Sequence, residues 1–248
     1  MDYKDCFKGR TAVITGAGSG MGLLAAQELA KAGANVVMCD INGEAAEGFA
    51  KAIRDNGGEA TVVVADVRKF ADAERAADTA ISTYGAIDLL LCLAGGNEAR
   101  CCSSPKPFYE QPLEVIDWGL DVNLKGPVYF ARACMPHMVR QGRGVILLTG
   151  SVTGFQGDGC GAMYGTAKSG LFNFVKGLAK AGAPHGVRAV CVSPGPVLTR
   201  PAMAGMKTLL GRAAEPIEIV DFMLYLCSDK AAFVTGTNHV IDGGRLSL

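Results

Sequence analysis

The sequence lacks any long apolar run. No stretch approaches the roughly 18 consecutive apolar residues that are needed to cross a bilayer. The opening segment "MDYKDCFKGR" is charged and has no apolar core of the kind that a secretory signal contains. We therefore expect a cytoplasmic protein with no membrane partner.

The sequence also lacks net charge. Lysine plus arginine and aspartate plus glutamate balance at 24 each, so no overall field exists to attract nucleic acid or an anionic membrane. Pro-rich or Ser-rich linkers and internal repeats are missing as well. These absences exclude a nucleic-acid partner and favour a single domain over residues 1–248.

Ligand patterns for a metal ion are absent too. The nine cysteines form no Cys-x-x-Cys pair, and the three histidines are far apart in the chain, whereas zinc sites usually draw on closely spaced ligands. We predict no metal. The adjacent Cys101 and Cys102 are expected to be free thiols, as suits a reducing cytoplasm.

Short apolar runs alternating with segments of helix length fill the chain. Nearly continuous apolar strands indicate that both faces of the sheet are covered, as in parallel sheets. The alternation predicts an α/β fold, a Rossmann-type doubly wound parallel sheet of about seven strands with helices on both faces. The predicted strands are 11–15, 35–40, 61–67, 87–95, 144–151, 187–193 and 238–242, and the predicted helices include 19–32, 43–56, 70–84, 112–141 and 163–182.

A glycine-rich turn, "TGAGSGMG" at 15–22, ends the first predicted strand and opens the first predicted helix. Gly16, Gly20 and Gly22 allow the backbone to turn tightly and to approach a pyrophosphate. The helix N-terminus beside Ser19 and Met21 offers unpaired N–H groups and the positive end of the helix dipole. This context predicts a dinucleotide-binding site.

Asp40 ends the second predicted strand, 18 positions beyond Gly22. A carboxylate there can accept hydrogen bonds from both ribose hydroxyls of NAD and would repel the 2′-phosphate of NADP. The glycine turn and residues 41–42 contain no arginine or lysine. We predict NAD as the cofactor, with NADP the less favoured choice; the alternative is that Asp40 only caps the next turn.

Tyr164 and Lys168, in "AMYGTAKSG" at 162–170, are four positions apart on a predicted helix and so share one face. A nearby ammonium favours the phenolate and lowers the phenol's pKa from about 10. Such a tyrosine can act as the general acid–base when a hydride is transferred at a secondary alcohol. Taken alone, the pair could also be an ordinary surface contact.

Seven motifs, in this order and spacing, resemble the short-chain dehydrogenase/reductase family in its single-domain form. The likeness spans nearly the whole chain. The motifs are "TGAGSGMG" at 15–22, "ADV" at 65–67, "DVNLKG" at 121–126, "GS" at 150–151, "YGTAK" at 164–168, "SPGPVLT" at 193–199 and "IDGG" at 241–244. One departure is Cys92-Leu93-Ala94-Gly95, where many relatives have Asn-Asn-Ala-Gly.

The resemblance implies an NAD(P)-dependent oxidoreductase that acts on CH–OH donors, and it implies four catalytic residues. Ser151 would hold the substrate oxygen, and Lys168 would also hydrogen-bond to the nicotinamide ribose. Asn123 would lie in a distorted part of its helix and support a water; Pro127, just beyond it, removes a helical hydrogen bond. The catalytic group is Asn123, Ser151, Tyr164 and Lys168, and the expected cofactor contacts are Gly16, Ser19, Gly20, Met21, Gly22, Asp40, Asp66, Val67, Ala94, Gly95, Tyr164, Lys168, Pro194, Gly195, Val197 and Thr199.

Three polar loops, 96–112, 152–163 and 195–212, are expected at the carboxyl ends of the strands, where open α/β sheets bind ligands. Their charges favour a polar substrate. "AGGN" at 94–97 with the long polar loop after it resembles some sugar-acid and polyol dehydrogenases of the family, which implies a small polar substrate such as a polyol, a sugar acid or a hydroxy acid. Segment 198–212 is expected to order over bound cofactor and exclude water. The candidate substrate residues are Asn97, Arg100 and Gln156.

The sequence thus predicts an NAD-dependent dehydrogenase, and two alternatives stay open. One is an NADPH-dependent 3-oxoacyl thioester (acyl-carrier-protein) reductase, against which Asp40 counts. The other is a catalytically idle NAD-binding regulator, against which the presence of all four catalytic residues counts. The resemblance also implies a homotetramer that buries helices 112–141 and 163–182 against partner copies.

Overall fold

A single parallel sheet organises the protein. The computed structural model describes residues 3–248. The strands are β1 (Thr11–Thr15), β2 (Asn35–Asp40), β3 (Glu59–Val64), β4 (Leu89–Cys92), β5 (Gly144–Thr149), β6 (Val187–Pro194) and β7 (Thr237–Ile241). They lie in the order β3-β2-β1-β4-β5-β6-β7, and every neighbouring pair is parallel. The predicted doubly wound sheet is confirmed.

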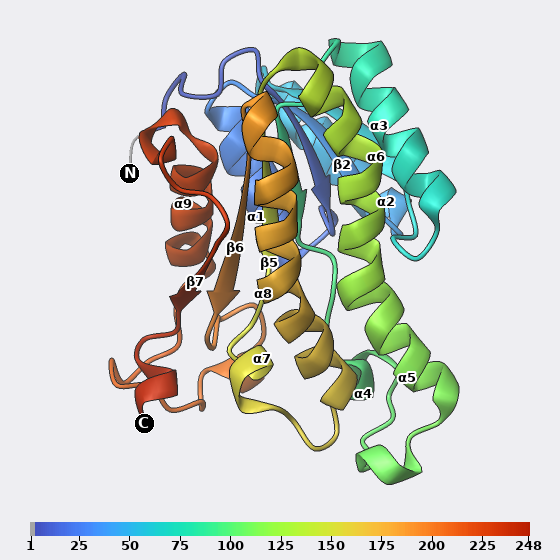
Figure 1. Ribbon diagram of the computed structural model, residues 1–248, viewed down its shortest axis with the longest axis vertical. Helices are drawn as coiled ribbons and strands as arrows, with labels where there is room; N and C mark the ends of the chain where they lie inside the picture. Colours follow the sequence, from blue (N-terminus) through green and yellow to red (C-terminus); the bar gives the residue numbers. More distant parts are fainter. Residues whose placement is uncertain (1–2) are drawn as a thin grey trace.

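Helices cover both faces of this sheet. One apolar core packs α1, α2 and α9 on one face, and a second packs α3, α6 and α8 on the other. In Figure 1, α6 and α8 stand in front of the sheet. Within residues 3–248, no helix has the length and apolar character that a membrane crossing requires. The helices are α1 (Gly20–Lys31), α2 (Gly43–Asp55), α3 (Phe70–Tyr84), α4 (Glu98–Cys101), α5 (Leu113–Leu120), α6 (Gly126–Gln141), α7 (Thr153–Gln156), α8 (Ala162–Gly182) and α9 (Pro216–Cys227).

At the carboxyl end of β4, a threonine side chain from the neighbouring strand takes the place of strand pairing. The predicted strand 87–95 is shortened to β4 because its carboxyl end leaves the sheet. There the N–H groups of Leu93 and Ala94 both donate to Oγ1 of Thr15, at 3.1 Å each. Thr15 therefore directs the segment after β4 toward the loop after β1, where the sequence predicts the cofactor.

The predicted helix 112–141 is divided by a π-helical turn, η2 (Asp121–Lys125), between α5 and α6. The N–H of Gly126 donates to the carbonyl of Asp121, five residues earlier, and the next residue, Pro127, has no N–H to continue the ladder. This confirms the predicted distortion at Asn123, which lies in the middle of the turn.

Helix α9 is an element that the sequence reasoning did not name. Its start is marked by Pro216 at the first helical position and by a capping box between Glu215 and Glu218. Ile219 and Met223, one helical turn apart, are fully buried against α1 and the sheet. These are ordinary helix signals, so the segment could have been predicted.

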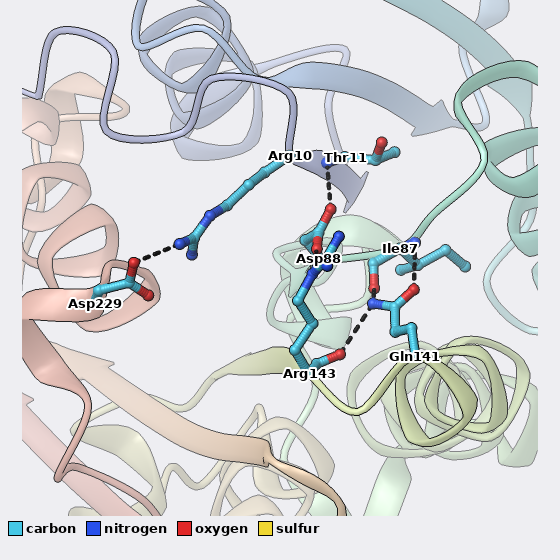
Figure 2. A network of polar contacts seen from close by, with 7 residues as sticks. All are labelled: Arg10, Thr11, Ile87, Asp88, Gln141, Arg143 and Asp229. Atoms are coloured by element: carbon cyan, nitrogen blue, oxygen red, sulfur yellow. Dashed lines mark hydrogen bonds and ion pairs between the residues drawn. The ribbon is translucent and has the colours of Figure 1, made fainter.

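A polar network around the buried Asp88 ties the amino ends of the strands together, as Figure 2 shows. Asp88, directly before β4, accepts a hydrogen bond from the N–H of Thr11 at 3.0 Å and forms an ion pair with Nε of Arg143 at 2.6 Å. Gln141 donates to the carbonyls of Ile87 and Arg143. Because the network lies at the amino ends of β1, β4 and β5, it fixes the sheet without occupying the carboxyl ends.

The nine cysteines, which all lie in the described part of the chain, are free thiols. The adjacent Cys101 and Cys102 are free, as predicted. Cys92 is fully buried at the end of β4, and burial raises its pKa to about 12. Such a thiol stays protonated at neutral pH and serves in packing.

Candidate active site

A cleft of about 750 Å³ opens at the carboxyl ends of the strands, between the loops that follow β1, β4, β5 and β6. In Figure 1 the strand arrows point toward this end of the molecule, where α4, α7 and the C-terminus lie. β1 and β4 are neighbours there, at the switch point where doubly wound sheets bind ligands. The sequence-predicted residues that line it are Gly16, Ser19, Gly20, Met21, Gly22, Asp40, Asp66, Val67, Ala94, Gly95, Asn97, Arg100, Ser151, Tyr164, Pro194, Gly195, Val197 and Thr199.

The glycine turn is shaped for a phosphate group. Gly16 has φ +71°, and a Cβ there would lie 2.9 Å from the backbone of Ala94. A Cβ at Gly22 would overlap the carbonyl oxygen of Gly16. Ser19 precedes α1 in an extended conformation, and its side chain makes no capping bond in the described structure. The first N–H groups of α1 therefore face the cleft, and the residues present fit a pyrophosphate.

Asp40 extends over the glycine turn from the end of β2. Its Oδ2 accepts from the N–H of Gly18 at 2.8 Å, and its Oδ1 accepts from the N–H of Asn42 at 2.9 Å. A Cβ at Gly18 would lie 2.8 Å from the carboxyl carbon. The carboxylate thus caps the next turn and also lines the cleft. Each oxygen keeps capacity to accept a further hydrogen bond.

The predicted adenine end of the cleft contains an ion pair. Nη2 of Arg68 lies 2.7 Å from Oδ2 of Asp66. The hydrogen bonds from Arg68 lower the pKa of Asp66 below its usual value. Val67, between them, packs against Gly126, where a Cβ would lie 3.0 Å from the valine side chain. The opposite charges of Arg68 and Asp66 therefore neutralise each other in this wall of the cleft.

Asn123 positions backbone instead of facing the cleft. It is fully buried. Its Oδ1 accepts from the N–H of Gly96, and its Nδ2 donates to the carbonyls of Gly96 and Gly119, all at 2.9 Å. Both amide hydrogens are used within the protein, so Asn123 could hold the predicted water only through an oxygen that accepts; that role stays a prediction. What it does is clamp Gly95–Gly96 at the cleft wall.

Tyr164 and Ser151 meet at the inner end of the cleft. Burial raises the pKa of Tyr164 above its usual value, and this is opposed first by a hydrogen bond with Ser151 and then by the charges of Arg200 and Arg100. The Ser151 Oγ also accepts from the N–H of Thr153 at 3.1 Å, which fixes the hydroxyl at the end of β5. A phenol, a hydroxyl and two guanidinium groups therefore line one cleft.

Lys168 lies one turn along α8 from Tyr164, and 3% of its surface is exposed. Its Nζ donates to the carbonyl of Thr149 at 2.6 Å and lies 5.5 Å from the centre of the Tyr164 ring. Nζ also lies 3.5 Å from where a Cβ of Gly95 would be, beside the predicted ribose position. Burial lowers the pKa of Lys168 to about 8.

The sequence predicts a lowered pKa for Tyr164. In the structure burial outweighs the groups that lower it, of which the largest are the hydrogen bond with Ser151 and the charges of Arg200 and Arg100. Nζ of Lys168 is bound to the carbonyl of Thr149, and its effect on the phenol stays a prediction.

The three predicted substrate residues have different surroundings. Arg100 lines the cleft, and so does Asn97. The Asn97 side chain is engaged: Oδ1 accepts from the N–H of Arg100 at 3.2 Å, and Nδ2 donates to Asp158 at 2.9 Å. Gln156 ends α7 and is exposed, outside the residues that line the cleft. Arg200, which follows the predicted cofactor motif, lines the cleft as well.

Glu98 is a site residue that the sequence reasoning missed. It is 2% exposed. Its Oε1 accepts from the N–H of Met163 at 2.8 Å, and its Oε2 accepts from the N–H of Tyr164 at 3.0 Å. Within residues 3–248, the first turn of α8 has no acidic residue and no side-chain cap of its own. Glu98, in the segment after β4, supplies both the negative charge and the cap, and thereby fixes the helix that carries Tyr164 and Lys168.

Comparison with known proteins decides the family. A family model described as short chain dehydrogenase matches residues 10–208. The chain belongs to the short-chain dehydrogenase family. Members of this family act on CH–OH donors with NAD or NADP, and this short-chain dehydrogenase is accordingly an oxidoreductase.

Three relatives that are named as dehydrogenases have a similar length. The chain is 33% identical to cis-4-hydroxycyclohexanecarboxylate dehydrogenase of Sinomonas cyclohexanicum, over 98% of this chain and 99% of the relative. It is 34% identical to cyclohexanol dehydrogenase of Acinetobacter sp. (strain SE19), over 97% and 96%. It is 27% identical to 7alpha-hydroxysteroid dehydrogenase of Bacteroides fragilis, over 96% and 95%.

The buried Lys168 of this short-chain dehydrogenase gives its stability a pH dependence. Its pKa is about 8 in the folded protein and about 10.4 in an unfolded chain. Below about pH 8 both states hold the proton, and the folded state bears the full cost of burying the ammonium. Between the two pKa values the unfolded state binds more protons, so stability rises with pH.

We expect the free energy of unfolding of the wild type, measured relative to Lys168→Met, to rise between about pH 8 and about pH 10.4. Urea unfolding of both proteins across this range measures the difference. Parallel pH profiles for the two proteins would contradict the assignment.

Proposed function

We propose that this short-chain dehydrogenase uses NAD to interconvert a small polar secondary alcohol and its ketone. The observation that carries the proposal is the cleft itself: Tyr164 and Ser151 meet at its inner end, and the Asp40 carboxylate stands over the glycine turn. A proton acceptor and a cofactor pocket are thereby joined in one cavity.

The chain's own residues perform the proton transfer. Ser151 holds the substrate oxygen by its hydroxyl, and Tyr164 takes the hydroxyl proton as the carbonyl forms or returns it in the reverse direction. NAD, when bound, supplies the hydride acceptor at the neighbouring carbon. Lys168, beside Gly95, donates toward the nicotinamide ribose and holds its orientation. Asn123 and Glu98 fix the two backbone segments between which this group lies.

The segment 198–212 is proposed to close over the bound cofactor. Its ends are held together, because the N–H of Leu198 donates to the carbonyl of Ala214 and the N–H of Ala214 donates to the carbonyl of Pro196, both at 2.9 Å. A loop pinned at its base can move as one unit and exclude water from the hydride path.

The choice of NAD is proposed from Asp40. The carboxylate is held at the predicted ribose position by two backbone donors, where it can accept ribose hydroxyls and repel a 2′-phosphate. Arg68, the cation that lines this end of the cleft, is paired with Asp66. We expect a cytoplasmic homotetramer, as the family resemblance implies.

Replacing Asp40 with alanine is expected to raise the KM for NAD by about 10-fold to 100-fold, because two charge-assisted hydrogen bonds to the ribose are lost. The KM for NADP is expected to fall, since the repulsion is removed. Asp55→Ala, an exposed carboxylate at the end of α2, is the matched control. Steady-state kinetics with both cofactors measures the change, and an unchanged NAD to NADP preference would exclude Asp40 from the choice.

The function is tested by following nicotinamide absorbance over a panel of polyols, sugar acids, hydroxy acids, ring alcohols and acyl thioesters, in both directions with NAD and NADP. Ring alcohols are included because the three relatives are named for hydroxyl groups on rings. NAD-linked turnover of a small polar alcohol is the expected result. Preference for NADPH and acyl thioesters would favour the reductase alternative, and cofactor binding without any turnover would favour an idle regulator.

A further inference from the structure

Two guanidinium groups that line the cleft pair with no carboxylate in the part of the chain that the structure describes. Arg100 lies in α4 and is exposed, and Arg200 follows Thr199 and is half-buried. Neither forms an ion pair within residues 3–248; the Arg200 side chain contacts Sδ of Met203 at 3.8 Å. Each of them lines the cleft. Unpaired arginines in a concave site are ready to bind an anion.

These arginines line the same cleft as Tyr164 and Ser151. A Cβ at Gly96 would lie 2.7 Å from Nη2 of Arg100 and 2.7 Å from Sγ of Cys101, so both side chains cover this glycine. Burial raises the pKa of Tyr164, and the charges of Arg200 and Arg100 act against that rise. Both guanidinium groups therefore belong to the cavity that holds the phenol.

The carboxylates near this end of the cleft are hydrogen-bonded to neutral donors. Asp158 accepts from Nδ2 of Asn97 at 2.9 Å and from the N–H of Cys160 at 3.0 Å. Glu98 accepts two backbone N–H groups at the start of α8, and Asp40 accepts two at the far end of the cleft. Within residues 3–248, none of these carboxylates forms an ion pair with Arg100 or Arg200, so both guanidinium groups keep their donors for a ligand.

We propose that Arg100 and Arg200 bind a carboxylate of the substrate, so that the substrate is a hydroxy acid and the product its oxo acid. This inference rests on the proposed function and narrows it. The planar guanidinium presents two parallel donors that match a carboxylate. Trp118, Val122 and Met203 also line the cleft, so it offers apolar surface to the carbon skeleton of such an acid.

The reaction balances without a further reactant. The carbinol carbon gives its hydrogen with two electrons to NAD, the hydroxyl gives its proton to the phenolate form of Tyr164, which becomes the phenol, and the C=O bond forms. The carboxylate stays ionised and unchanged between the arginines. The hydroxy acid is oxidised, and NAD is reduced to NADH.

The test compares two acids, cis-4-hydroxycyclohexanecarboxylate and 3-hydroxybutanoate, with their methyl esters, which keep the carbinol and lose the charge. Steady-state kinetics with saturating NAD is measured for the wild type, Arg100→Gln and Arg200→Gln. Lys176→Gln, an exposed charge on α8, is the matched control, and Arg200→Lys tests the need for the planar fork. Quenching of the fluorescence of protein-bound NADH by each acid gives a binding readout that does not depend on turnover.

We expect the wild type to bind at least one of the acids about 10-fold to 100-fold more tightly than its ester, as charge-assisted hydrogen bonds contribute. Each arginine variant should remove this preference by raising the KM for the acid, with the KM for NAD unchanged.

Equal binding of acid and ester, or binding of neither acid to the NADH complex, would overturn the proposal. So would an arginine variant that raises the KM for NAD instead, because the arginines would then serve the cofactor. NAD-linked turnover of neutral alcohols alone would refute the carboxylate site and leave the proposed function standing, whereas absence of NAD-linked turnover on every compound would refute the proposed function.

Discussion

Replacing Tyr164 with phenylalanine is expected to lower kcat by about 10²-fold to 10⁴-fold, the range that general acid–base catalysis contributes. The phenylalanine keeps the ring and its packing but cannot take the substrate proton. Lys168 and Asn123 are held by Thr149 and by the backbone of Gly96, so their positions do not depend on the phenol. Binding of NAD is therefore expected to change little.

Initial rates with the best alcohol of the panel measure kcat, and quenching of protein fluorescence on titration with NADH measures cofactor binding. Tyr109→Phe, at a tyrosine that is 83% exposed, is the matched control and should keep full activity. If Tyr164→Phe retained more than about a tenth of the wild-type kcat, a loss below the range for general acid–base catalysis, another group would be the acid–base.

Replacing Glu98 with glutamine is expected to lower both stability and kcat. The glutamine amide can no longer accept both helix N–H groups as a carboxylate does, and the favourable charge at the start of α8 is lost. When a buried N–H at the start of a helix loses its charged acceptor, the free energy of unfolding falls by about 2–3 kcal/mol. For a chain of this length, that loss corresponds to a melting temperature lower by about 5–10 °C.

The loss of kcat follows from position, because Tyr164 is one of the two residues whose N–H groups Glu98 holds. Thermal unfolding followed by circular dichroism measures the stability, and initial rates well below the transition measure the activity. Glu110→Gln, an exposed carboxyl in the next loop, controls for the change in charge. Full activity of Glu98→Gln at a temperature where it is folded would show that Glu98 stabilises the fold without positioning the catalytic tyrosine.

The elements with local signals could be predicted from the sequence. Apolar runs mark β1 and β2, glycines mark the start of α1, and a carboxylate ends β2. The fold and the lining of the cofactor cleft could therefore be predicted from residues that are neighbours in the sequence. The distortion at Asn123 was also predictable, because Pro127 removes a specific backbone donor. In these places local propensity and the overall fold favour the same structure.

The features that depend on contacts between distant segments could not be predicted in this way. Glu98 is a loop carboxylate in the sequence, and nothing near it shows that it meets α8, 65 residues further along the chain. The direction of Lys168 likewise depends on the carbonyl of Thr149 at the end of β5. The pairing of Arg68 with Asp66 is local. That Arg100 and Arg200 form no ion pair within the described residues can be seen only in the folded structure.

The central claim is that this cleft transfers a hydride from a carbinol carbon to NAD. The most direct test uses the best alcohol of the panel with deuterium at its carbinol carbon and follows the label by mass spectrometry of the nicotinamide cofactor. We predict that the deuterium is recovered in NADH, and that the Tyr164→Phe protein forms the labelled NADH at a strongly reduced rate. Deuterium that is found in water or stays in the product, with none in NADH, would contradict the account.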